Sequence, residues 1–214
     1  MDELKKIQIL RFYHESKPLY VCFCREQWFW KEHYSGMFYD HLGSVVNIDP
    51  DALIKKHEKR TSKNPTLSAG KEALAIVNEC IESKQDFSIE TTLASKVSIR
   101  QIKQAKSRGY KIVVIYVGTT HVAINLRRIA KRVENGGHDI PEQDVVRRHT
   151  VSRENLIEHF DLIDTLMIVD NSEKDGELFA TVENGHIHKH INTTVTWGDN
   201  LLEYIRRKIN KSAF

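Results

Sequence analysis

Short apolar runs alternate along this chain with longer segments in which apolar residues recur every three or four positions. The runs have the length and composition of strands buried on both faces, and the periodic segments have the spacing of amphipathic helices. The strands predicted in this way are 20–24, 44–49, 86–93, 111–117 and 164–170, with shorter pieces at 178–182, as an edge strand, and 186–191.

Helices are predicted between most of these strands. Their ranges are 2–15, a segment ending near residue 41, 68–84, 96–107, 119–134, a long helix starting at Pro141, and 200–210. Gly43 and Gly109 stand where helices should end. This alternation indicates an α/β fold, a mostly parallel central sheet with helices wound on both faces. No repeat, low-complexity tract or linker interrupts it, so residues 1–214 are predicted to form a single domain.

Composition narrows the class of protein. The length of 214 residues suits one α/β domain, and 40% hydrophobic with 29% charged residues is ordinary for a soluble globular chain. The net charge of +3 is too small to indicate nucleic-acid binding, and the sequence offers neither a recognition helix nor an aromatic platform. We therefore expect no nucleic-acid partner.

Membrane, redox and metal chemistry are not indicated either. No apolar run is long enough to span a bilayer, and the first residues do not form a signal peptide, so no membrane partner is expected. The three cysteines do not suggest a disulfide framework, and a reducing cytoplasm is the predicted location. His186, His188 and His190 would share one strand face, but they lack acidic or cysteine partners nearby, so no metal site is expected.

Polar residues gather where two predicted strands end. Asp49 precedes Pro50, which cannot continue a central ladder, and the carboxyl edge of such a sheet borders the ligand crevice. Capping of the helix that follows is the alternative role for Asp49. Glu90, Thr91 and Thr92 close the third strand and suit a polyhydroxylated substrate, whereas the alternative is a threonine cap for the helix starting near residue 96.

The segment after the first strand is the anomaly of the sequence. A strand that leads into a helix is where a nucleotide-binding α/β protein has its glycine-rich phosphate loop, yet no glycine occurs between Tyr20 and Ser35. Tryptophan has the single codon TGG, so reading one base later places glycine at both Trp28 and Trp30. With permitted codons, the shifted frame reads Ala-Gly-Ser-Asn-Gly-Ser-Gly-Lys-Ser-Thr, a complete P-loop with its lysine at Lys31.

We therefore hypothesise that one extra base near Cys22 and one lost base near Tyr34 have garbled this segment. A natural, degenerate loop is the competing interpretation. As printed, the loop places Glu32 where a Mg²⁺-binding serine belongs and bulky side chains where phosphates must approach the backbone. The printed chain is predicted to bind nucleotide poorly or not at all.

Several segments together resemble the zeta-toxin family of P-loop kinases, including small chromosomal members. The matching pieces, in the family's order, are Val46-Asn-Ile-Asp-Pro-Asp, Phe87-Ser-Ile-Glu-Thr-Thr-Leu, Gly136-Gly-His-Asp-Ile-Pro-Glu, Val146-Arg-Arg, Asn155-Leu and Val169-Asp-Asn-Ser. The resemblance covers roughly residues 18–175. It implies a P-loop NTPase-like three-layer sandwich and transfer of a terminal phosphoryl group from ATP or GTP, with Mg²⁺, to a hydroxyl of a small substrate, in the toxins a UDP-linked amino sugar.

Carried over residue by residue, the resemblance assigns roles to the polar positions. Asp49 would orient or deprotonate the acceptor hydroxyl as a catalytic residue, and the substrate-binding set would be Glu90, Thr91 and Thr92. Arg128 and Arg132 would neutralise charge on the transferring group, although charged positions along a helix are usually a solvated face. The nucleotide-binding set would be Lys31, Glu32, His33, His138, Arg147 and Arg148.

One departure from the family concerns a further arginine, which is replaced here by Val151; Arg153 is the nearest substitute on the same helix. An antitoxin protein is a candidate partner by the same resemblance. The alternative function is a non-catalytic, degenerate P-loop domain that acts as a binding or interaction module.

Overall fold

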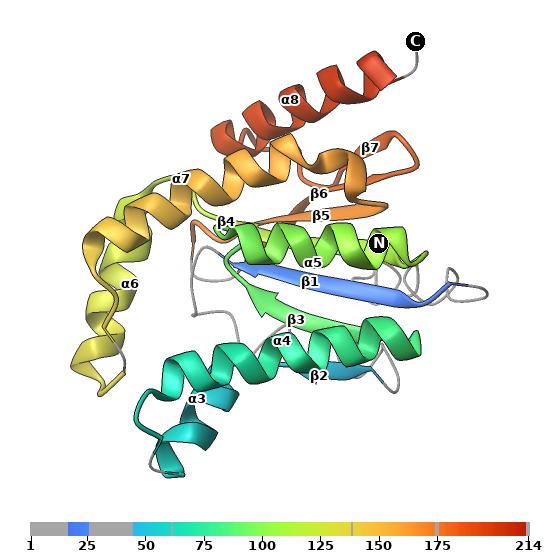
Figure 1. The fold of residues 1–214 in the computed structure, drawn as a ribbon. Coiled ribbons are helices and arrows are strands. Elements are labelled where there is room, and N and C mark those ends of the chain that lie inside the picture. The colour runs from blue at the N-terminus through green and yellow to red at the C-terminus, as the bar shows by residue number, and fades with distance from the viewer. Residues whose placement is uncertain (1–16, 26–44, 61, 138, 174–175, 213–214) are drawn as a thin grey trace.

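A seven-stranded sheet forms the centre of the molecule in the computed structural model, which describes residues 17–25, 45–60, 62–137, 139–173 and 176–212 (Figure 1). The strand order is β2-β3-β1-β4-β5-β6-β7. The strands are β1 (Leu19–Arg25), β2 (Val46–Ile48), β3 (Phe87–Thr91), β4 (Lys111–Gly118), β5 (Thr165–Asp170), β6 (Glu177–Glu183) and β7 (His186–Lys189). From β2 to β5 all neighbours are parallel, and β6 and β7 are antiparallel. The mostly parallel sheet is therefore confirmed, while β6, predicted as an edge, is paired on both sides.

Five of the six helices in the described residues match predicted helices in order, with shifts at their starts, whereas the first, directly after Asp49, was not among the predicted ranges. These helices are α3 (Pro50–Lys59), α4 (Pro65–Ser83), α5 (Lys96–Ser107), α6 (Val122–Glu134), α7 (Glu142–Glu158) and α8 (Thr196–Ser212), and a 3₁₀ turn spans Phe160–Leu162. Helix α4 begins before the predicted residue 68 because Asn64 caps it, accepting a hydrogen bond of 3.0 Å from the Leu67 amide. Helix α5 has the predicted bounds. The helices predicted at 2–15 and up to residue 41 lie outside the described residues.

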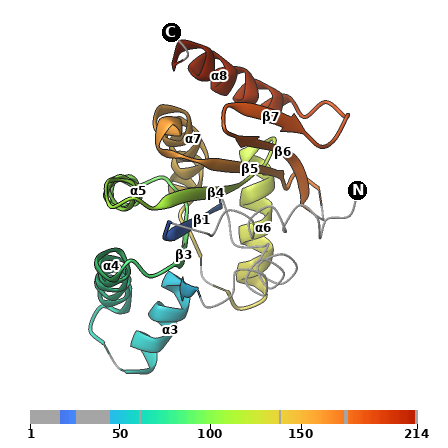
Figure 2. The ribbon, with the colours of Figure 1, turned by 90° about the vertical axis from the view of Figure 1, so that its right-hand side faces the viewer.

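Helices lie around the sheet and beyond its carboxyl edge. Figure 1 shows α6 and the beginning of α7 extending past the carboxyl ends of the parallel strands. Turned by 90°, Figure 2 shows α3 and α4 together at the β2 end of the sheet and α8 at the opposite end. Helices α3 and α4 are joined by Glu72, which binds Lys56 Nζ at 2.5 Å and His57 Nε2 at 2.7 Å.

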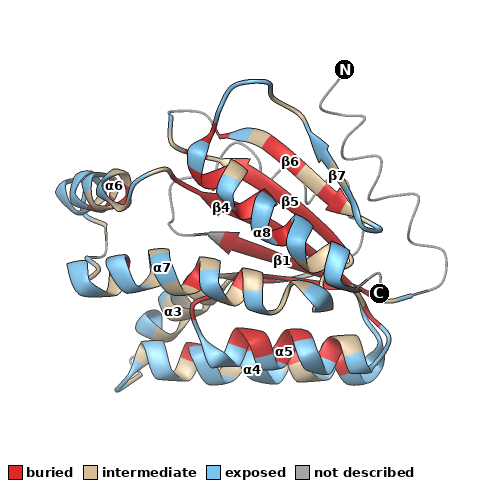
Figure 3. Ribbon diagram, turned by 90° about the horizontal axis from the view of Figure 1, so that it is seen from above, coloured by how far each residue is buried: buried red, intermediate tan, exposed pale blue. Residues whose placement is uncertain are grey.

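Each face of the sheet carries a buried apolar cluster, because successive strand residues point to opposite sides. On β1, Tyr20, Cys22 and Cys24 belong to a cluster packed against α4, α5, α7 and α8. Val21 and Phe23 point the other way and join apolar residues of β4 and β5 in a second cluster. Figure 3 shows the central strands as the most continuously buried part of the molecule. Strands buried on both faces are what the uninterrupted apolar runs predicted.

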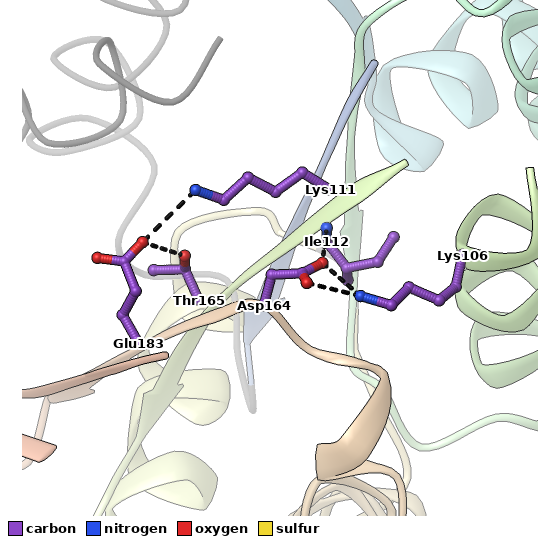
Figure 4. Close-up of polar contacts among 6 residues, drawn as sticks. All are labelled: Lys106, Lys111, Ile112, Asp164, Thr165 and Glu183. Carbon is purple, nitrogen blue, oxygen red and sulfur yellow. Dashed lines mark hydrogen bonds and ion pairs between the residues drawn. The ribbon is translucent and has the colours of Figure 1, made fainter. Parts of the chain in front are cut away.

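Charged residues at the amino edge of the sheet have structural partners (Figure 4). Asp164 Oδ2 accepts a hydrogen bond of 2.8 Å from the Ile112 amide, and both of its oxygens lie 2.6 Å from Lys106 Nζ. Glu183 Oε1 accepts from the Thr165 hydroxyl at 2.9 Å and lies 3.5 Å from Lys111 Nζ. These carboxylates hold the starts of β4 and β5, whereas the candidate site residues lie at the opposite edge of the sheet.

Candidate functional site at the carboxyl edge of the sheet

Asp49 lies directly after β2, at the carboxyl edge of the sheet. Because Ile48 pairs with Ile89, the residues that follow them, Asp49 and Glu90, lie at the same level of neighbouring strands. Asp49 is also the N-cap of α3, since its Oδ1 accepts hydrogen bonds from the amides of Asp51 at 3.0 Å and Ala52 at 3.2 Å. The capping role is therefore present, and it fixes the carboxylate at the positive end of the helix dipole.

The predicted substrate-binding residues divide between the two faces of β3. Glu90 is only 8% exposed and lies on the face opposite Ile89, paired in register with Phe23 of β1. Thr91 points toward α5, where its Oγ1 lies 2.8 Å from Ser98 Oγ and accepts a hydrogen bond of 3.2 Å from the Leu93 amide. Thr91 is thus part of the turn that leads into α5, whereas Glu90 places a buried carboxylate on the other face of the strand.

The cap of α5 is Ser95 and not one of the threonines. Ser95 Oγ accepts a hydrogen bond of 3.2 Å from the Ser98 amide and lies 2.9 Å from Ser98 Oγ. Thr92 is half-buried between the strand and this turn. The turn after β3 is consequently a dense set of hydroxyl contacts rather than an open loop.

Arg128 and Arg132 lie on α6, which follows β4. Arg128 donates from Nη1 to the Asn171 carbonyl at 2.8 Å and from Nη2 to the Glu173 carbonyl at 2.6 Å, so it holds the loop after β5. Burial lowers the pKa of Arg128 from its ordinary value. A Cβ added at Gly137 would lie 2.5 Å from Arg132 Cγ, so the chain reverses tightly against this side chain.

The paired glycines Gly136 and Gly137 form a tight turn directly after α6. Gly136 has a φ of +79°, and the Gly137 amide donates to the Arg132 carbonyl at 2.9 Å. Arg147 and Arg148 follow at the beginning of α7. Arg147 Nη2 pairs with Asp144 Oδ1 at 2.9 Å, and its Nη1 lies 3.5 Å from the Ala94 carbonyl of the turn after β3.

Four members of the predicted nucleotide-binding set, Lys31, Glu32, His33 and His138, lie outside the described residues. The other candidates belong to elements that meet at one edge of the sheet. Asp49 directly follows β2, and Glu90 is the last residue but one of β3. Arg147 reaches the turn after β3, and Arg128 binds the loop after β5.

A hydrogen-bond chain that the sequence did not predict joins the ends of β4 and β5. Ser172 Oγ accepts from the Thr120 amide at 2.9 Å and contacts Asp170 Oδ1 at 2.6 Å. Trp197 of α8 donates its Nε1–H to the same Asp170 oxygen at 2.9 Å. Trp197 also packs on Gly118, where an added Cβ would lie 2.7 Å from the indole. A glycine at the end of a buried strand is the one local sign of this close packing, because Trp197 is remote from Gly118 in the sequence.

Arg153 is engaged at the same place. Its Nη2 donates to the Thr119 carbonyl, and its guanidinium lies 4.8 Å from the centre of the Trp197 ring. The arginine nearest to Val151 in the sequence therefore contacts the carboxyl end of β4.

A family model provides the decisive comparison for this arrangement: the zeta-toxin model matches residues 34–181, more than half of the chain. The chain belongs to the zeta-toxin family. A Haemophilus influenzae protein of uncharacterised function is 32% identical over 104 residues, which is 49% of this chain and 74% of that protein.

Solved structures share the zeta-toxin-family fold. A chain of the PezAT chromosomal toxin–antitoxin system of Streptococcus pneumoniae has a TM-score of 0.54 and 15% identity, over 99% of this chain and 97% of its own. The AvrRxo1-ORF1:-ORF2 complex with ATP has a TM-score of 0.62 and 14% identity, over 95% and 67%. At these identities the likeness is one of fold, and it confirms the predicted α/β, P-loop kinase-like architecture.

The described ranges show neither a membrane-spanning helix nor a metal-binding cluster. None of the helices there combines the length and the apolar character needed to cross a bilayer. The same part of the chain contains no cluster of three or more His, Cys, Asp or Glu side chains suited to a metal ion. Of the three histidines on and after β7, His190 contacts Thr181 Oγ1 through Nε2 at 2.9 Å.

Proposed function

We propose that this zeta-toxin-family chain is built to transfer the terminal phosphoryl group of ATP or GTP to a hydroxyl of a small polyhydroxylated substrate, such as a UDP-linked amino sugar. The observation that carries the proposal is the parallel register of β2 and β3, which sets Asp49 beside the buried Glu90 at the carboxyl edge. β1 lies next to β3 and leads directly into the segment that contains Lys31. Acceptor and phosphate sites are thereby adjacent by topology.

Phosphoryl transfer would give each of these residues a different role. Asp49, fixed by its capping bonds, would orient the acceptor hydroxyl and take its proton. Glu90 and Thr92 would bind other hydroxyls of the acceptor. Arg147 and Arg148 lie at the beginning of α7, where they would offset charge on the phosphates, since phosphoryl transfer depends mainly on positioning and charge stabilisation.

The contacts of α6 divide its two candidate arginines by role. Arg128 binds two backbone carbonyls, so its direct contribution would be to hold the loop after β5 in place beside the nucleotide. Arg132 would neutralise charge near the glycine turn. Mg²⁺ would be held by a serine at position 32 in the shifted reading of the loop, because the printed Glu32 would repel the phosphates.

Two supports come from proteins of similar fold. The AvrRxo1-ORF1:-ORF2 complex was solved with ATP, which favours ATP as the donor here. PezAT is a toxin–antitoxin system, which favours an antitoxin protein as a partner of this chain. The three cysteines are buried and form no disulfide, and a cytoplasmic location would keep their thiols reduced.

Calorimetric titration with Mg-ATP tests the loop hypothesis and the proposed site together. The printed chain should bind weakly or not at all, and a chain with the shifted loop should bind with micromolar or better affinity. The substitutions in that restored chain are R25G, E26S, Q27N, W28G, F29S, W30G, E32S and H33T. Adding K31A to the restored chain should abolish the gain, because the lysine contacts the β- and γ-phosphates.

Tight binding by the printed chain would refute the prediction for the printed loop, and absence of binding by the restored chain would contradict the proposed site. Reading the bases across codons 20–36 separates a garbled record from a natural degenerate loop. An intact frame that encodes Trp28 and Trp30 would favour the second candidate function, a non-catalytic binding module, because its loop lacks the glycines that phosphates require.

A further inference from the structure

Helix α7 makes side-chain contacts with the carboxyl ends of the two strands that flank β1. Toward β3, Asn155 Nδ2 donates to the Leu93 carbonyl at 2.7 Å, and Arg147 Nη1 lies 3.5 Å from the Ala94 carbonyl. Toward β4, Ser152 Oγ lies 2.8 Å from Tyr116 Oη. Since β3 and β4 are the neighbours of β1 in the sheet, α7 bridges the strand that leads into the phosphate-loop segment.

The turn that Asn155 contacts has an unusual backbone. Leu93 has a φ of +56°, in the left-handed region of backbone conformation that residues other than glycine and asparagine rarely adopt. Leu93 is also 1% exposed. Such a conformation persists only where surrounding contacts hold it, and it is typical of functional sites. Here the Leu93 amide donates to Thr91 Oγ1 at 3.2 Å, and its carbonyl accepts from Asn155.

The bond between Asn155 and Leu93 lies next to the residues assigned to the acceptor. Leu93 directly follows Thr92 and lies three residues after Glu90, the two side chains assigned to the acceptor. The path of the chain after β3 depends on the left-handed residue, so a side chain that holds the Leu93 carbonyl stabilises the backbone next to Thr92. Arg147, eight residues before Asn155 on α7, belongs to the group assigned to the nucleotide.

We propose that Asn155 is a positioning residue for the acceptor side of the site: its amide fixes the left-handed turn after β3 and, through α7, keeps that turn in register with the nucleotide-binding beginning of the helix. This inference rests on the proposed phosphotransferase function and adds to it a residue that touches neither substrate. Loss of the amide donor should loosen the acceptor site and leave nucleotide binding unchanged.

Hydrogen exchange on the printed chain tests the structural half. N155A and N155D both remove the donor, and N155D keeps the size of the side chain. The matched control is N135A, because Asn135 Nδ2 makes the same kind of bond, 2.8 Å to the Lys131 carbonyl, at the end of α6. We expect amides 92–95 to exchange about tenfold faster in N155A and N155D, with no change there in N135A. Equal exchange in all variants would overturn the proposal.

Steady-state kinetics on the restored chain tests the functional half. N155D should raise KM for the acceptor and lower kcat, about tenfold in kcat/KM, while KM for ATP and the calorimetric affinity for Mg-ATP stay unchanged. N155Q, which keeps an amide donor, should recover part of the loss. A parallel change in the ATP constants, or no change in the acceptor constants, would overturn the positioning role. No transfer by the restored parent chain would instead refute the proposed function, and this inference with it.

Discussion

Asp49 combines two functions in one carboxylate, and substitution can separate them. Its Oδ1 caps α3 through bonds of 3.0 Å and 3.2 Å to successive backbone amides. Asparagine caps a helix about as well as aspartate does, but it cannot take a proton from a hydroxyl. We therefore predict that D49N keeps the stability of the restored chain and loses its phosphoryl transfer, whereas D49A loses both.

The magnitudes follow from the two roles. Removing an N-cap costs about 0.5–2 kcal/mol, which for a domain of this size corresponds to a melting point lower by about 2–4 °C per kcal/mol. Removing a general base slows transfer by about 10²–10⁴-fold, equivalent to about 2.7–5.5 kcal/mol of transition-state stabilisation. D49A should show both effects, and D49N only the second, with Mg-ATP affinity unchanged in each.

Thermal unfolding and a transfer assay with a panel of UDP-sugars measure the two effects separately. The control is N64A, which removes the corresponding cap of α4, a bond of 3.0 Å to the Leu67 amide, without touching the proposed acceptor site. N64A should lower the melting point and leave transfer unchanged. Full transfer activity in D49N would show that Asp49 is only a helix cap, and loss of ATP binding in D49A would show that its role is structural.

Three further predictions concern the packing and titration of the chain. G118A should lower the free energy of unfolding in urea by about 1–3 kcal/mol, because the added Cβ would lie 2.7 Å from Trp197. G70A is the control: nothing lies within 4 Å of its added Cβ, so it should stabilise α4 by about 0.5–1 kcal/mol. Equal effects of the two substitutions would contradict the packing argument. W197F should cost about 1–3 kcal/mol, since it leaves a carboxylate oxygen without the indole donor 2.9 Å away, and a neutral result would mean that this bond contributes nothing. Burial raises the pKa of Tyr110 to about 12, above the value of about 10 in the unfolded chain, so the stability that the neutral hydroxyl contributes is complete below pH 10 and is lost as the pH rises toward 12. Y110F should therefore lose less stability than the parent chain between pH 10 and pH 12. An unchanged profile of unfolding free energy against pH would contradict this prediction.

Much of the architecture could be predicted because strands buried on both faces give uninterrupted apolar runs. The runs around Val21 and Val114 became adjacent central strands, and the acidic residue after β2 lies at the predicted edge. Helix starts were less predictable where a polar residue upstream supplies the cap, as Asn64 does for α4. The start of α6 shifted to Val122 because Thr119 and the residue after it belong to the contacts at the ends of β4 and β5.

The site was predictable only as far as it follows from strand ends. Asp49 and Glu90 could be placed because both lie at the carboxyl ends of predicted strands, which meet at one edge of a parallel sheet, whereas the observed register puts them at the same level. Contacts between elements far apart in the chain leave no local pattern, so the bond between Asn155 and Leu93, 62 residues apart, could not be predicted. The two carbonyl contacts of Arg128 were missed for the same reason, since a helical arginine reads as part of a solvated face.

Transfer of the γ-phosphoryl group of ATP, followed by ³¹P NMR with the restored chain and a panel of UDP-sugars, tests the central claim most directly. We predict a phosphorylated sugar that appears with the restored chain and is absent with its D49N variant, although that variant binds Mg-ATP equally well. A restored chain that binds Mg-ATP and yet phosphorylates none of the panel, or a D49N variant that forms product at the parent rate, would contradict it.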